Sequence, residues 1–284
     1  MPGSGTVPSA RPDDAPVVCV IVTYRRRELL AACVDAVLAQ SRPPDTVLVI
    51  DNDHLAKDVL AGADERVVVQ EMDENVGPAG GYERGFRDAL ERGAGAIWAV
   101  DDDVVPAPDC LERLLEAHTD VAVPLQRKPG GVRGFPPSWN GPLFDARVVR
   151  TVGLPRKDLF FWAEDTEYVY RCREAGFRRT HVPGAEVMHH NPRARSRREA
   201  RDWQLYYEVR NTLEYRLRIR PRTVKGVARA AGGVTGKLLS IVFVEPSKRR
   251  SLALWWKGVR DFAAGRLGKR VDPQGWSEAG DIDR

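Results

Sequence analysis

The chain has 284 residues, of which 43% are hydrophobic and 30% are charged, and its formal net charge is +4. This composition is typical of a globular protein and excludes a chain that is disordered or membrane-embedded throughout. The best candidate for a membrane span, residues 238–244, falls far short of the ~20 apolar residues that cross a bilayer, so we expect none.

The length predicts one large domain, or one domain with an appendage. Residues 1–16 are rich in Pro, Ser, Gly and Ala and lack an apolar segment, so we expect a disordered tail and no secretory leader. The cysteines lack the paired spacing of a zinc or disulfide framework, and a reducing cytoplasm fits them. They are Cys19, Cys33, Cys110 and Cys172.

Strands and helices alternate from residue 17 onward. Continuous apolar runs predict buried strands, and apolar residues at helical spacing predict the helices between them. The expected elements are strands at 17–22, 47–50, 67–69 and 97–100, with helices at 29–38 and 77–92. This alternation predicts right-handed crossovers and an α/β fold with an open, mostly parallel sheet flanked by helices.

The strand at 97–100 ends in three consecutive carboxylates, Asp101, Asp102 and Asp103. Buried carboxylates cost several kcal/mol unless a positive charge meets them. Mg²⁺ or Mn²⁺ would meet this need, and these ions commonly bind phosphate oxygens as further ligands, which points to a nucleotide diphosphate. Alternation along an extended backbone puts Asp101 and Asp103 on one side, so we expect these two to face the ion. Alternatively, the three residues solvate a strand end before the turn at Pro106.

Polar side chains also follow the other strands. Thr23, Asp51 and Asp101 stand at the carboxyl ends of three predicted parallel strands. Open α/β sheets bind ligands in the crevice at that edge, so we expect the three to line one site. The alternative is that they are ordinary loop residues.

The middle of the chain holds a predicted helix at 111–118 and a Gly- and Pro-rich loop at 129–142. Loops of this length are usually functional or mobile. The Trp139-Asn140-Gly141 sequence in this loop either shapes a ligand subsite or anchors a tight turn.

An aromatic run at residues 159–162 ends in Glu164 and Asp165 and precedes a predicted helix that runs to Gly176. A carboxylate beside an aromatic wall and a second carboxylate has a raised pKa, which suits a general base. Alternatively, Asp165 caps the helix.

A predicted strand at 185–189 ends in His189 and His190. An imidazole at the edge of a crevice completes a metal site that already holds carboxylates. The alternative is a structural or surface role for both histidines.

Residues 193–284 are predicted to form a helical, basic region, with helical segments at 203–213, 224–231, 238–244 and 252–262. Aromatic and basic residues together, as at Trp255 and Trp256, favour contact with an anionic membrane surface. Alternatively, this helix packs on the catalytic domain or on another subunit of a homo-oligomer. The clustered basic residues are Arg193, Arg195, Arg197, Arg198, Arg201, Lys248, Arg249 and Arg250.

Several short motifs occur in a fixed order at predicted strand ends. They are Val20–Arg25, Val49–Asn52, Asn75–Gly77 with Gly80-Gly81 and Arg84-Gly85, Asp101–Asp103, Trp162–Asp165 and His189. The set resembles the family-2 inverting glycosyltransferases of GT-A fold. We therefore expect a GT-A catalytic domain at 17–192, with a C-terminal helical appendage.

Two later segments resemble bacterial galactofuranosyl- and rhamnosyltransferases of cell-envelope glycan assembly. They are Tyr206–Asn211 and Asp261–Arg266. This resemblance favours UDP-galactofuranose as donor over dTDP-rhamnose, with a glycan or polyprenyl-linked glycan as acceptor. It implies a cytoplasmic enzyme that is peripheral on the inner face of the cell membrane.

The resemblance also implies a role for individual residues. The donor would be bound by Thr23, Tyr24, Arg25, Asp51, Asn75, Gly80, Gly81, Arg84, Asp101 and Asp102, and the metal by Asp103, Asp101 and His189, with His190 as the fallback. Asp165 would be the base on the acceptor hydroxyl, and Glu164 would grip the acceptor sugar. Trp139, Asn140, Gly141 and Trp162 would complete the acceptor site.

Two other functions compete with this interpretation. A nucleotidyltransferase would carry a Gly-rich loop with a basic residue after its first strand, where this chain has Thr23-Tyr24. A nucleic-acid-binding protein would use the arginine cluster, and its affinity would fall steeply with salt. We expect no nucleic-acid partner.

Overall fold

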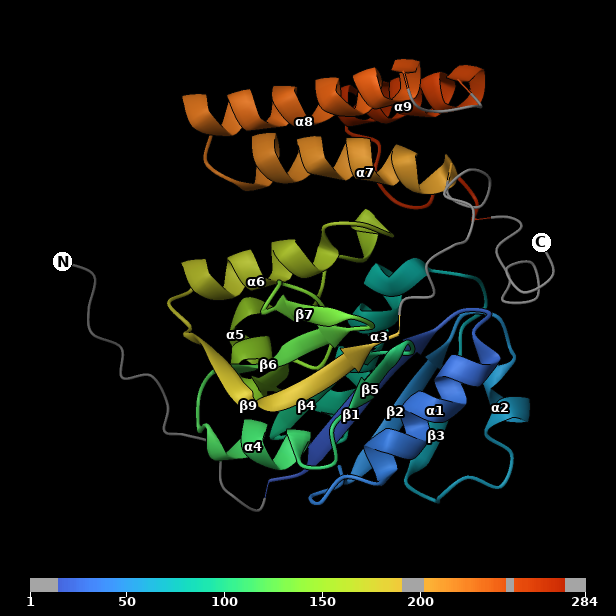
Figure 1. Ribbon diagram of the computed structural model, residues 1–284, viewed down its shortest axis with the longest axis vertical. Helices are drawn as coiled ribbons and strands as arrows, with labels where there is room; N and C mark the ends of the chain where they lie inside the picture. The colour runs from blue at the N-terminus through green and yellow to red at the C-terminus, as the bar shows by residue number, and fades with distance from the viewer. Residues whose placement is uncertain (1–14, 191–201, 244–247, 274–284) are drawn as a thin grey trace.

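The computed structural model describes residues 15–190, 202–243 and 248–273. Its centre is a nine-stranded sheet in the order β3-β2-β1-β4-β8-β6-β9-β5, with β7 paired to β6 (Figure 1). The strands are β1 Val17–Thr23, β2 Thr46–Asp51, β3 Val67–Glu71, β4 Ala96–Asp101, β5 Val104–Pro106, β6 Val121–Lys128, β7 Gly131–Gly134, β8 Leu143–Asp145 and β9 Arg179–His189.

Helices cover both faces of this sheet and form a separate layer at one end of the molecule (Figure 1). The α-helices are α1 Arg27–Leu38, α2 Ala56–Val59, α3 Gly77–Glu91, α4 Cys110–Glu116, α5 Ala146–Val152, α6 Glu164–Glu174, α7 Asp202–Glu214, α8 Val224–Phe243 and α9 Lys248–Ala263. A 3₁₀ turn, η1, spans Lys157–Leu159, and a π-helical turn, η2, spans Tyr215–Ile219.

The first half of the sheet is parallel and buried. Strand β1 pairs with β2 and β4, and all seven of its residues are buried. Alternate β1 side chains enter two cores, one shared with α1 and the other with α3. This two-sided burial is why the β1 sequence reads as a continuous apolar run. The register sets Thr23 beside Asp51 and Val22 beside Asp101, so these strand ends meet at one edge.

The second half of the sheet is mixed and differs from the sequence expectation. Strand β8 is antiparallel to β4 and β6, β9 is parallel to β6, and β5 is antiparallel to β9. The segment expected as a loop, 129–142, contains β7, which forms a hairpin with β6. Strands β5, β7 and β8 have only three or four residues each, so they carry too little alternation to be recognised by pattern.

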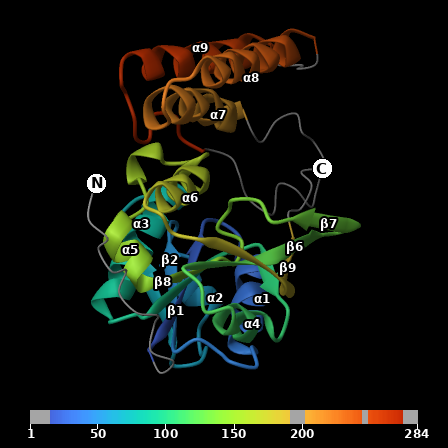
Figure 2. The ribbon, with the colours of Figure 1, turned by 90° about the vertical axis from the view of Figure 1, so that its left-hand side faces the viewer.

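The C-terminal helices pack on one another above α6 (Figures 1 and 2). Val209 and Leu213 of α7 share an apolar cluster with Ala230 of α8 and with Trp255 and Val259 of α9. Helix α8 is one continuous helix where the sequence predicted two segments, because its glycines weaken the apolar pattern without ending the helix.

The predicted fold class is confirmed: the protein is α/β, with helices on both faces of its sheet and a C-terminal helical appendage. The four cysteines are buried free thiols. In the described ranges, each helix is too short or too polar to cross a bilayer. The predicted tail (1–16) falls outside the described residues apart from positions 15 and 16, as does the arginine cluster at 193–201.

Candidate functional site

Three consecutive carboxylates stand at the end of β4, and their side chains make different sets of contacts. Asp101 accepts a hydrogen bond from the Tyr82 hydroxyl (2.8 Å), and Asp102 accepts one from Thr23 Oγ1 (2.9 Å). Asp102 and Asp103 are each 4% exposed, so their charges must be compensated from within the protein. The strand ends of β1 and β4 therefore form one carboxylate centre, as the sequence predicted.

The compensating charge is Arg26, which the sequence analysis did not single out. Its Nη1 atom lies 2.7 Å from Asp102 Oδ1 and 2.8 Å from Asp103 Oδ2. Arg25, the predicted donor residue, donates its backbone N–H to Asp53 and sets its guanidinium over the Tyr24 ring. Arg25 has a φ of 57°, a turn that redirects the chain, so sequence order could not show which arginine faces the aspartates.

His189 reaches Asp103 because β5 and β9 pair antiparallel, with Val104 opposite His189. Its Nε2 atom lies 3.2 Å from Asp103 Oδ1, and its Nδ1 atom lies 3.0 Å from Arg133 Nη1. Arg133 stands on β7 and is a second cation that the sequence analysis missed, because its strand was expected to be a loop. The neighbouring histidine, His190, donates its backbone N–H to the Asp103 carbonyl.

Asp103 and His189 fit a divalent cation in ligand type and position. Asp103 Oδ1 is a buried oxygen that faces His189 Nε2 at 3.2 Å, and carboxylate oxygen with imidazole nitrogen suits Mg²⁺ or Mn²⁺. Asp101, the third predicted ligand, is turned toward Tyr82. Within the described residues, no three His, Cys, Asp or Glu side chains are grouped around one metal position.

The three aspartates titrate differently. Burial and the Asp103 charge raise the pKa of Asp101 to about 7. Burial also raises the pKa of Asp102, against the opposing charge of Arg26. For Asp103, burial is outweighed by His189 and Arg26, and its pKa stays below the ordinary value. Asp103 is therefore the carboxylate that stays ionised most readily.

Glu164 and Asp165 open helix α6 beside this centre. The Glu164 side chain is buried and its Oε2 atom has no hydrogen-bond partner. Burial, followed by the charges of Asp165 and Asp101, raises its pKa well above the ordinary value. The Tyr82 hydroxyl bonds Asp101, the Tyr82 ring stacks on Trp139, and Trp139 packs against Tyr168 of α6, so contiguous side chains link the two predicted carboxylate groups.

Asp165 is partly exposed, and burial raises its pKa to about 6. Thr166 donates to its Oδ1 atom from both the backbone N–H and the hydroxyl. The N-cap of α6 is Ala163, so the alternative that Asp165 caps the helix is wrong. A carboxylate with this pKa suits proton abstraction near neutral pH.

The predicted acceptor residues divide into buried and exposed members. Trp139 is 2% exposed and stacks on Tyr82 at 4.5 Å, and Asn140 donates to Gln126, so both lie in the interior. The Gly141 carbonyl accepts from the Trp98 indole. Trp162 is 42% exposed two residues before Glu164, where it can meet a ligand.

Several predicted donor residues hold the backbone around the strand ends. Asp51 accepts from the N–H groups of Asp53 and Ala56, and Asn75 accepts from Gly77 N–H. Gly81 lies against Val22 of β1, where a Cβ atom would stand 2.5 Å from the valine side chain. These contacts fix the β2 and β3 loops beside Thr23 and Asp101.

Arg84 lies away from the carboxylate centre. It pairs with Asp88 and lines a cavity of about 620 Å³ on the outer face of α3, together with Asn75 and Gly80. The three aspartates after β4 do not line this cavity.

Comparison with known proteins gives concordant matches. The family described as glycosyl transferase family 2 matches residues 18–181, more than half of the chain. Galactofuranosyltransferase GlfT1 of Mycolicibacterium smegmatis is 34% identical over 200 residues, which cover 56% of this chain and 66% of the relative. The GlfT1 protein of Mycobacterium tuberculosis is 28% identical over 198 residues, covering 56% and 65%. The alignments thus span just under two thirds of these relatives.

Solved structures share the fold at low sequence identity. A mannosyltransferase from Pyrobaculum calidifontis, solved with GDP-Man and Mn²⁺, superposes with a TM-score of 0.58 at 14% identity, covering 90% of this chain and 77% of that one. TarS of S. aureus superposes with a TM-score of 0.59 at 13% identity, covering 88% and 49%. The likeness extends beyond the sheet because these matches cover most of this chain.

Replacing Arg26 by methionine should destabilise the protein at pH 8. The change removes the guanidinium that pairs with both buried carboxylates and leaves Asp102 without its ion-pair partner, a loss of about 3 kcal/mol in the free energy of unfolding. Without Arg26 the pKa values of both carboxyls rise in the folded state. The loss is therefore complete above those pKa values and shrinks as the pH falls.

Urea unfolding at pH 8 and pH 5 measures this difference. The control is Arg113→Met, which breaks an ion pair with Asp109 whose side chains are 47% and 41% exposed, and it should cost much less stability because water screens this pair. Equal losses in the two variants would contradict the role of Arg26.

Proposed function

Because the chain belongs to glycosyl transferase family 2, we propose that it transfers galactofuranose from UDP-galactofuranose to a hydroxyl group of a glycan or lipid-linked glycan. The observation that carries the proposal is the convergence of two carboxylate groups. Asp101 ends β4 and is followed by Asp102 and Asp103, Glu164 and Asp165 open α6, and the packed rings of Tyr82, Trp139 and Tyr168 link the two groups. Such a site has one region for a diphosphate and another for an acceptor hydroxyl.

The reaction on this site is a displacement at the anomeric carbon. Asp165 takes the proton of the acceptor hydroxyl, the hydroxyl oxygen bonds to the anomeric carbon, and the bond to the nucleoside diphosphate breaks. Attack from the face opposite the leaving group inverts the configuration. Asp165 suits this role because burial places its pKa near 6, and Glu164 remains protonated beside it as a hydrogen-bond donor to the acceptor sugar.

The donor side of the site would hold Mg²⁺ or Mn²⁺. Asp103 and His189 are the proposed ligands, supported by the buried Asp103 Oδ1 atom that faces His189 Nε2, and Asp101 would join them by turning from Tyr82. The ion would neutralise charge on the departing diphosphate. Thr23, Tyr24, Asp51 and Asn75 would frame the nucleoside at the adjoining strand ends. Arg26 and Arg133 are further cations within reach of the phosphates.

The acceptor is proposed to be lipid-linked because α8 and α9 carry an exposed apolar and basic surface. We call this the α8–α9 face. Its exposed apolar side chains include Val227, Leu239, Val242, Phe243 and Trp256, and its exposed basic side chains include Lys248, Arg249 and Arg250. The combination suits an anionic membrane surface, which would place the enzyme on the inner face of the cell membrane. Trp255 instead packs inward and donates to the Val234 carbonyl.

A panel of nucleotide sugars tests the donor. The purified protein is incubated with Mn²⁺ or Mg²⁺, one donor and a series of octyl glycosides, and release of nucleoside diphosphate is followed. UDP-galactofuranose is expected to give the fastest acceptor-dependent release, ahead of dTDP-rhamnose, UDP-galactopyranose and GDP-mannose. Faster release from dTDP-rhamnose would replace the proposed donor, and release from none of them would contradict the function.

Replacing Asp165 by asparagine should lower kcat by about 10²- to 10⁴-fold, because the base is lost while the side chain keeps its size. Binding of UDP with Mg²⁺, measured by calorimetry, should not change. In the wild type, kcat should fall about tenfold per pH unit below the Asp165 pKa of about 6 and level off above it. This fall should be absent from the variant. Near-normal turnover of Asp165→Asn would exclude Asp165 as the base.

Vesicle co-sedimentation tests the α8–α9 face. The protein should sediment with phosphatidylglycerol vesicles and much less with phosphatidylcholine vesicles, and Phe243→Ser with Trp256→Ser should weaken binding. Val132→Ser is the control, because Val132 is 55% exposed on β7, outside the α8–α9 face. Equal sedimentation of both variants and the wild type would remove this surface from the proposal.

A further inference from the structure

The five residues that precede α6 form a loop with unusual backbone geometry. Phe160, Trp162 and Ala163 have φ values of 64°, 76° and 68°, which side-chain-bearing residues rarely adopt. Each such conformation costs free energy and persists only where its surroundings enforce it. We call residues 159–163 the α6 lead-in. Because it runs directly into Glu164, its path decides where the two carboxylates of α6 lie.

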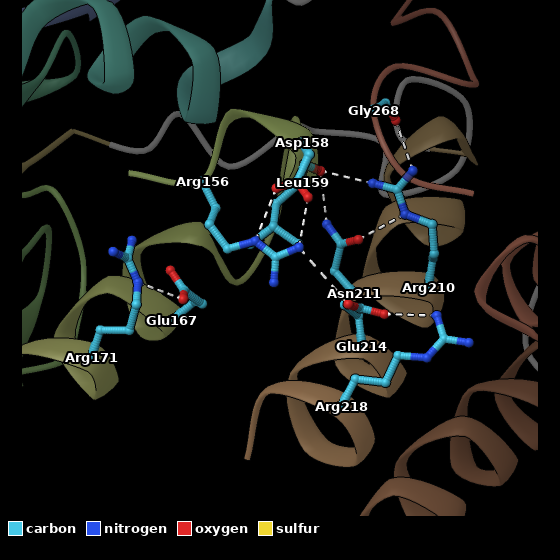
Figure 3. A network of polar contacts seen from close by, with 10 residues as sticks. All are labelled: Arg156, Asp158, Leu159, Glu167, Arg171, Arg210, Asn211, Glu214, Arg218 and Gly268. Atoms are coloured by element: carbon cyan, nitrogen blue, oxygen red, sulfur yellow. Dashed lines mark hydrogen bonds and ion pairs between the residues drawn. The ribbon is translucent and has the colours of Figure 1, made fainter. Parts of the chain in front are cut away.

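Two side chains from helix α7 hold this lead-in by its carbonyl groups (Figure 3). Asn211 Nδ2 donates to the carbonyls of Leu159, Phe161 and Trp162 at 2.9, 2.7 and 3.0 Å. Arg210 Nη2 donates to the Leu159 carbonyl at 2.8 Å. The side chains of both residues are fully buried. The Asn211 amide thus donates hydrogen bonds to three carbonyl groups of a strained loop.

Arg210 also fixes the orientation of Asn211. Its Nε atom donates to Asn211 Oδ1 at 2.8 Å, so the amide nitrogen must face the lead-in. Its Nη1 atom donates to the Gly268 carbonyl at 2.7 Å, and the guanidinium lies 5.0 Å from the ring centroid of Tyr207. The planar guanidinium makes these contacts together, which a lysine ammonium cannot do. The two residues therefore act as one unit.

The opposite side of the lead-in rests on helix α3. Ala79 N–H donates to the Phe160 carbonyl at 3.2 Å. Gly77, with φ 69°, lies so close to that carbonyl that a side chain would collide with it. The lead-in is thus held between α7 and the start of α3, the helix that carries the proposed donor residues Gly80 and Gly81.

We propose that Arg210 and Asn211 are positioning residues that set the lead-in so that Glu164 and Asp165 face the acceptor. This rests on the proposed function, since it assigns the geometry of the same two carboxylates. Neighbouring arginines make other contacts. Arg156 pairs with Asp158, and Arg171 pairs with Glu167 (Figure 3). Arg171 also donates to the Val152 and Leu154 carbonyls. Among the described residues, Arg210 and Asn211 supply the side chains that bond the carbonyls of Leu159, Phe161 and Trp162.

Asn211→Leu tests this role because leucine has nearly the same size and no donor. We expect kcat for sugar transfer to fall about 100-fold, the order of loss for a displaced catalytic group. The affinity for UDP with Mg²⁺ should stay as in the wild type. The pKa below which kcat falls should decrease toward the ordinary aspartate pKa, because a displaced Asp165 is better hydrated. Hydrogen exchange of residues 159–165 should become faster.

Tyr207→Phe is the matched control on the same helix. It removes hydrogen bonds to the Val271 carbonyl and from Arg270 N–H but leaves the lead-in carbonyls bonded. We expect its kcat and pH profile to match the wild type even if its melting temperature falls. Asn211→Ser keeps one donor, so its kcat should lie between those of the wild type and Asn211→Leu, and it serves if the leucine variant does not fold.

The outcomes separate the two proposals. If Asn211→Leu has the same kcat and pH profile as the wild type, the positioning role is overturned and the proposed function stays intact. Equal losses in Asn211→Leu and Tyr207→Phe, with UDP affinity lost in both, would also overturn it by showing a general structural effect. A wild-type protein that transfers no sugar from any donor would overturn the proposed function itself.

Discussion

Charge compensation at the end of β4 is the constraint on which the rest of the structure depends. Asp102 and Asp103 are buried, and such carboxylates are tolerated only where cations reach them. Arg26 arrives from the start of α1, and His189 arrives from the end of β9. Arg26 is positioned by the parallel half of the sheet, and His189 is positioned by the mixed half. Both halves must therefore be assembled before the site exists.

The environments of the carboxylates assign them different chemistry. Asp103 faces His189 and Arg26 and keeps a low pKa, which suits a ligand for positive charge. Glu164 is buried beside Asp165, and burial raises its pKa well above the ordinary value, while partly exposed Asp165 has a pKa of about 6. Carboxyl groups whose pKa values are pushed apart in this way suit the different roles of acid, base and counter-charge that we propose for them.

The helical appendage contacts the catalytic carboxylate segment through hydrogen bonds from α7 to the strained backbone that precedes α6. The family match ends at residue 181, yet Arg210 and Asn211 lie beyond it and bond the carbonyls that lead into α6. The strained lead-in needs this support, because three left-handed residues before one helix would otherwise relax. Helices α8 and α9 of the same appendage lie on the far side of α7 from the sheet (Figure 2).

The sequence by itself determined the parallel half of the sheet, because β1, β2 and β4 are buried on both faces and read as continuous apolar runs. It also determined which carboxylates stand at strand ends and before α6. Only the tertiary structure decided which cations compensate the charges of these carboxylates. Arg26 rather than Arg25 reaches the aspartates because Arg25 turns the chain, and Arg133 arrives on a four-residue strand that has no readable pattern. The hold of Asn211 on a loop some 50 positions earlier is likewise invisible in the sequence, because it joins an amide to backbone carbonyls, which every residue type carries.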